Sequence, residues 1–191
     1  DWVVSLGVSK VIIRCDQEPA MKALRELAMK ELRRRGVNVV PEESPVGASQ
    51  ANGLAEQAVG HVAGMVRTIL SSTEARLGER LSTSLPVLAW LIDYVGTLTT
   101  LYSIGSDGRT AWSRLKGRGP FRDLLPEWGE QVWCRVRVKG KLGLRWHQAT
   151  FLGLRRTTME KLVAMKLEGE PKTIFVARSI RRMPKERAWQ M

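Results

Sequence analysis

The order of apolar and amphipathic segments near the start of the chain most limits the folds open to it. KVIIRC, residues 10–15, has the continuous apolar character of a strand that is covered on both faces. VNVV, residues 37–40, predicts a second short strand, which ends at Pro41. The segment between them predicts a helix with one core-facing stripe, formed by Ala20, Leu24, Leu27, Ala28 and Leu32. Strand, helix and strand in this order place the first part of the chain in the α/β class.

Two further helices are expected after a loop that is rich in turn-forming residues and closes at Asn52-Gly53. The first helix runs over residues 54–77, and its apolar stripe consists of Leu54, Ala58, Val62, Met65 and Ile69. The second helix runs over residues 84–104. That stretch is apolar enough to invite a membrane interpretation, but Pro86, Asp93 and Gly96 favour a buried core helix.

The hydrophobic periodicity changes near Trp128. EQVWCRVRVKGK alternates apolar residues with arginine and lysine, which is the pattern of a strand with one buried face. Several short strands follow, separated by Gly and Pro, and this spacing predicts a small barrel. We therefore expect a first domain over residues 1–105, a connector with a short helix over 106–126, and an all-β domain over 127–191.

The net charge of +12 is concentrated in the last third of the chain. Residues 127–191 hold 15 Lys and Arg against 6 Asp and Glu, whereas residues 1–126 hold 16 against 13. This asymmetry indicates a polyanionic partner for the C-terminal domain. Two distant cysteines and two histidines cannot form a disulfide framework or a zinc site.

Two acidic residues stand at positions where an acid needs an explanation. Asp16 follows the first strand directly, where the chain leaves the core. Glu56 lies off the apolar stripe of the long helix, and small residues below it leave room for a bulky group. Each acid also has a local explanation: Asp16 as the N-cap of the helix that follows, and Glu56 as a first-turn acid that interacts with the helix dipole.

The order and spacing of these acids resemble the catalytic core of retroviral and LTR-retrotransposon integrases. In that family a strand acid sits in a Cys-Asp or Ser-Asp step, as Cys15-Asp16 does, and a helix acid follows an Asn-Gly pair by three positions, as Glu56 does. The second motif reads SPVGASQANGLAEQAV, and 39 residues separate Asp16 from Glu56, close to the spacing of the D,D-35-E class. GRTAWSRLKGRGP and WGEQVWCRV, FLGL and VARSIRRMP resemble the family's downstream segment and its SH3-like barrel.

The resemblance implies a truncated RNase H-like core followed by an SH3-like barrel. It also implies a metal site in which Asp16 and Glu56 hold Mg²⁺ or Mn²⁺, since hard divalent ions prefer carboxylate oxygens. The family's first catalytic Asp lies upstream of the segment where this chain begins. We therefore expect the intact protein to be a polynucleotidyl transferase, and the present chain to be inactive by itself.

The basic residues of the C-terminal domain are candidate contacts to DNA phosphates, because such contacts release counterions without reading sequence. They are Arg135, Arg137, Lys139, Lys141, Arg145, Arg178, Arg181, Arg182, Lys185 and Arg187. Trp133 and Trp146 lie among these charges and either stack on a ligand or pack against the barrel.

The function expected from these features is DNA integration by a retroelement integrase that joins retroelement ends to target DNA. The intact enzyme would be a homo-oligomer in a nuclear or cytoplasmic nucleoprotein particle, with no membrane partner and no secretion. The alternative is a non-catalytic remnant of a retrotransposon polyprotein that still binds nucleic acid. A third possibility is an unrelated α/β protein with a basic tail.

Overall fold

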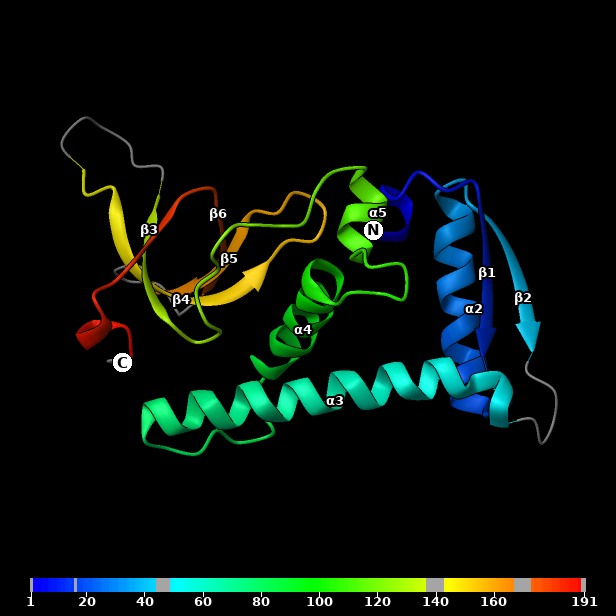
Figure 1. Ribbon diagram of the computed structural model, residues 1–191, viewed down its shortest axis with the longest axis horizontal. Coiled ribbons are helices and arrows are strands. Elements are labelled where there is room, and N and C mark those ends of the chain that lie inside the picture. The colour runs from blue at the N-terminus through cyan, green and yellow to red at the C-terminus, as the bar shows by residue number, and fades with distance from the viewer. Residues whose placement is uncertain (1, 16, 44–48, 137–142, 167–172, 190–191) are drawn as a thin grey trace. The chain divides into compact units, whose positions relative to one another are not determined.

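The computed structural model describes residues 2–15, 17–43, 49–136, 143–166 and 173–189 (Figure 1). The chain divides into two compact units, residues 1–61 and residues 62–191, which are described separately below. Compact packing units need not coincide with evolutionary domains, so the domain limits given above stay a prediction.

The first unit is built on two parallel strands joined by a helix. A short helix α1 (Trp2–Ser5) precedes β1 (Lys10–Cys15), α2 (Pro19–Arg34) and β2 (Asn38–Glu43). Parallel strands cannot be joined by a tight hairpin, and α2 supplies the crossover. The predicted strand, helix and strand are confirmed, but β1 is covered on one face rather than on both, and Ile12 is exposed. The core of the unit consists of Met29, Val37 and Val39, against which Val4, Val11, Ile13 and Leu32 pack.

The predicted stripe of α2 is partly wrong. Leu24 and Leu27 are exposed, whereas Arg25 and Met29 are buried. The guanidinium Nη2 of Arg25 lies 3.4 Å from Glu43 Oε1, so this buried charge meets a carboxylate at the end of β2. A two-stranded sheet is too narrow to cover both apolar rows of the helix, and the packed row is the one that includes Met29.

Helix α3 (Ser49–Leu77) starts earlier than predicted, and its apolar stripe is only partly buried. Val62, Met65 and Ile69 pack against the core of the second unit, as expected. Leu54 and Ala58 are exposed, contrary to the prediction, and so are the other described residues from 54 to 61.

The second unit contains α4 (Leu88–Tyr102), α5 (Ala111–Lys116) and a five-stranded antiparallel sheet. The strands follow the spatial order β6-β5-β4-β3-β7. They are β3 (Gln131–Arg135), β4 (Trp146–Leu154), β5 (Lys161–Met165), β6 (Thr173–Ala177) and β7 (Ile180–Arg182), and a 3₁₀ turn η1 (Lys185–Arg187) follows them. The expected run of short antiparallel strands is confirmed.

Helix α4 is the expected buried helix, and it packs directly on β4. The Tyr94 ring meets Phe151 edge to face, with 5.7 Å between the ring centroids, and its hydroxyl donates to the carbonyl of Pro126 at 3.3 Å. A bulge in β4 between Phe151 and Gly153 brings Gly153 against the ring of Tyr94. Asp93 Oδ1 pairs with Arg156 Nη2 at 2.8 Å and ties the helix to the turn after β4.

The architecture is therefore mixed α/β with a five-stranded antiparallel sheet. Among the described strands, β6 and β7 stand at the two edges and no pairing joins them into a closed barrel. A search of the described helices finds none that is both long and apolar enough to cross a membrane.

Candidate nucleic-acid interface

Of the two predicted metal ligands, Asp16 and Glu56, the structure describes only Glu56. Residue 16 lies outside the described residues, directly after the end of β1 at Cys15. Glu56 is described and exposed on α3. The described part of the chain contains no group of three residues able to hold a metal ion. One described carboxylate does not form a magnesium site, so we assign no chemical step to a metal.

The local explanations for these two acids do not fit the helix starts that the structure shows. The N-cap position of α2 belongs to Glu18 rather than to residue 16. Helix α3 begins at Ser49, which places Glu56 two turns inside the helix, and no acidic residue occupies its first turn. The attraction between a first-turn acid and the helix dipole fades within that turn, so it does not explain Glu56.

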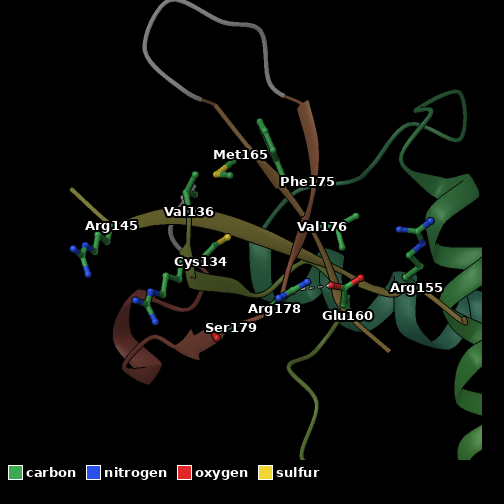
Figure 2. A pocket seen from close by; sticks show the side chains of 11 residues that line it. Cys134, Val136, Arg145, Arg155, Glu160, Met165, Phe175, Val176, Arg178 and Ser179 are labelled. Carbon is green, nitrogen blue, oxygen red and sulfur yellow. Dashed lines mark ion pairs between the residues drawn. The ribbon is translucent and has the colours of Figure 1, made fainter. Parts of the chain in front are cut away.

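Four arginines of the second unit line a cavity on the sheet. The cavity has a volume of about 760 Å³, which is within the usual range for ligand pockets. Part of its lining is apolar, and burial raises the pKa of the Cys134 thiol there, so that side chain remains neutral. Figure 2 shows the apolar lining residues Cys134, Val136, Met165, Phe175 and Val176.

Four arginines and one glutamate line the same cavity. In Figure 2, Arg145 lies at the left of the cavity and Arg155 at the right. The ion pair between Arg178 and Glu160 lies between these two arginines. Arg135 completes the set. The distance from Arg178 Nε to Glu160 Oε1 is 3.4 Å, and the Arg178 side chain is 85% exposed, so this contact leaves the guanidinium open to solvent. A cavity with a net positive lining attracts an anionic ligand.

The structure separates the predicted DNA-binding residues into distinct groups. Arg135, Arg145 and Arg178 line the cavity. Lys185 and Arg187 are exposed on η1 and do not belong to the cavity lining. The remaining members of the basic hairpin, which lie outside the described residues, are Arg137, Lys139 and Lys141.

Arg182 has a structural partner. Its guanidinium donates two hydrogen bonds of 2.7 Å to the carboxylate of Glu130, whose side chain is almost completely buried. The same carboxylate accepts the backbone N–H of Glu127 at 2.9 Å. This pairing raises the pKa of Arg182 through the hydrogen bond to Glu130. A buried carboxylate needs such a partner, so Arg182 contributes to folding whether or not it also meets a phosphate.

Sequence reasoning missed Arg155. It follows β4 directly and was not among the basic residues of the two hairpins, yet it lines the cavity. Its backbone N–H donates to the carbonyl of Glu160 at 2.8 Å, which fixes the turn that presents both residues. The adjacent pair Arg155-Arg156 after an apolar strand was the signal available in the sequence.

A second basic surface lies on the outer face of the sheet. Trp133 stands directly across from Gln148 on β4 and from Arg181 on β7, and Arg135 stands across from Trp146. Residues across from each other share a face, and residues two apart on one strand do as well. We call this set the tryptophan face: Trp133, Arg135, Trp146, Gln148 and Arg181.

Comparison with known proteins does not identify a relative: no protein-family model matches the chain, and no curated protein matches it in sequence.

Proposed function

We propose that the five-stranded sheet binds DNA through its phosphates, and that the chain is part of a retroelement integrase. The observation that carries the proposal is the cavity lining, in which four arginines face a single glutamate. Guanidinium groups suit phosphate oxygens because their fixed donors match the geometry of the anion. The concentration of positive charge in residues 127–191 supports the same partner.

In this proposal, the sheet corresponds to the SH3-like barrel of the integrase family. Support comes from five short antiparallel strands and from the arginines that lie on them or directly beside their ends. Residues 1–105 correspond in this proposal to the distal part of an RNase H-like core, and the parallel strands with a crossover helix in the first unit support that assignment.

The catalytic part of the proposal is polynucleotidyl transfer in the intact enzyme, with Asp16 and Glu56 as ligands of Mg²⁺ or Mn²⁺. An ion held by these two carboxylates would supply charge stabilisation for the attacking and leaving oxygens. Support comes from the strand that ends directly before residue 16. It also comes from Glu56, which is exposed and lies too far inside α3 to interact with the helix dipole.

Hydrogen exchange of the whole chain with and without a 20-base-pair duplex tests where DNA binds. We expect added duplex to slow exchange in peptides that cover β3, residues 143–146 and residues 173–182, because these segments carry Arg135, Arg145 and Arg178. Peptides from α2 serve as the internal control and should not change. Protection confined to α2, or absent from the sheet, would contradict the proposal.

A further inference from the structure

We propose that the tryptophan face binds unpaired nucleotides, with a base stacked on Trp133. This inference rests on the proposed function, which requires only contacts to phosphates, and it adds a preference for single strands or frayed ends. The reasoning starts from the unusual exposure of an aromatic side chain in the middle of a sheet.

Trp133 is 38% exposed although its strand lies between two hydrogen-bonded neighbours. Its neighbours on β3, Val132 and Cys134, point into the core and are almost fully buried. The alternation of the strand therefore sets the indole on the solvent side. The tryptophan side chain has a large apolar area, so covering it with a ligand is favourable in free energy.

The groups around Trp133 indicate which ligand covers it. Arg181 stands across from Trp133, and its guanidinium carbon lies 4.7 Å from the centre of the Trp146 ring. This cation–π contact orients both groups over the outer face. The tryptophan face thus carries two guanidinium groups and no carboxylate. A partner that offers both a flat aromatic ring and negative charge fits this surface, and a nucleotide offers both.

The face and the cavity meet at Arg135, which belongs to the tryptophan face and also lines the cavity. Arg135 lies two residues from Trp133 on the same face of β3, so a strand whose phosphate contacts Arg135 would have a neighbouring base within reach of the indole. In a duplex, neighbouring base pairs cover the faces of each base, so an exposed indole gains little from it. An unpaired base has an open face, and stacking on an aromatic side chain is tolerant of sequence.

The test compares two probes on the whole chain: a 12-nucleotide oligothymidine strand, which does not pair with itself, and a 20-base-pair duplex. Trp133→Ala is expected to weaken binding of the single strand by about tenfold or more, and binding of the duplex by less than about twofold. Trp133→Phe keeps an aromatic ring and should restore most of the single-strand affinity. Leu124→Ala, which alters another strongly exposed apolar side chain of the same unit, is the matched control and should change neither affinity.

Photocrosslinking provides a readout that does not depend on a variant. An oligothymidine carrying 5-iodouracil should crosslink to Trp133 or Trp146 in the unmodified chain. The inference fails if Trp133→Ala leaves single-strand binding unchanged, if it weakens both probes equally, or if no crosslink maps to the tryptophan face while both probes bind. Failure of the unmodified chain to bind either probe at low salt would instead overturn the proposed function itself.

Discussion

Replacing Gly153 by alanine is expected to lower the free energy of unfolding by about 2–4 kcal/mol and Tm by about 5–15 °C. Gly153 has a φ of 140°, a conformation that L side chains rarely adopt. A Cβ at this position would lie 3.0 Å from Tyr94 Cδ2 and 3.2 Å from Tyr94 Cβ. The Tyr94 ring has little freedom to retreat, because Phe151 and the carbonyl of Pro126 hold it. The backbone strain of the positive φ and the steric overlap with Tyr94 therefore both destabilise the fold at position 153.

Thermal unfolding followed by circular dichroism measures this effect. Gly119→Ala is the matched control, since an added Cβ there meets nothing within 4 Å and no positive φ opposes it. We expect that control to stay within about 0.5 kcal/mol of the unmodified chain. Equal stability of the Gly153 and Gly119 variants would show that α4 does not pack on β4 through this bulge.

Removing the four cavity arginines together is expected to weaken duplex binding by at least about 100-fold at 50 mM salt. The variant replaces Arg135, Arg145, Arg155 and Arg178 with alanine. Each guanidinium that neutralises a phosphate releases counterions, and this release is most favourable at low salt. Three of these arginines have no carboxylate partner among the described residues, and the ion pair of the fourth, Arg178 with Glu160, is exposed to solvent. The substitutions should therefore leave the fold intact.

A control with the same loss of charge separates local contacts from total charge. Arg67, Arg109, Arg118 and Arg122 belong to the same unit, are exposed, and lie outside the cavity lining. Changing these four residues to alanine should weaken duplex binding far less than the cavity variant does. Arg182 is unsuitable for either variant, because its loss would leave the buried carboxylate of Glu130 without its partner. Equal losses for the two variants would mean that net charge alone, rather than the cavity, governs binding.

Local patterns were sufficient for most elements of secondary structure. KVIIRC matches β1 in both bounds, and the alternation after Trp128 led to β3. Strand β2 continues past Pro41, contrary to the prediction, because it stands at the edge of its sheet, where a missing N–H is tolerated. The features that were predicted correctly depend on neighbours in the sequence, which is why pattern reasoning reaches them.

Tertiary choices were harder to predict. Helix α2 has two apolar rows, and periodicity cannot tell which one a narrow sheet covers; the buried row includes Arg25, a residue that no apolar pattern would select. FLGL was noticed as part of a strand, but the need for glycine at position 153 arises from Tyr94, far away in the sequence. Barrel closure likewise depends on edge strands whose pairing leaves no local signal.

The candidate site shows the same division. Charge composition alone pointed to the C-terminal part of the chain, and three of the predicted arginines line the cavity. Arg155 was missed because its neighbours in space come from other strands. The exposure of Trp133 follows from which face of β3 the core occupies, and the sequence alone favoured packing over stacking for this side chain.

The salt dependence of duplex binding by the whole chain tests the central claim most directly. If the cavity arginines neutralise phosphates, a plot of log Kobs against log salt should fall with a slope of roughly −3 to −4 or steeper, since each contact contributes about −0.9. A slope shallower than about −1 would contradict the account, because binding without counterion release cannot depend on those arginines.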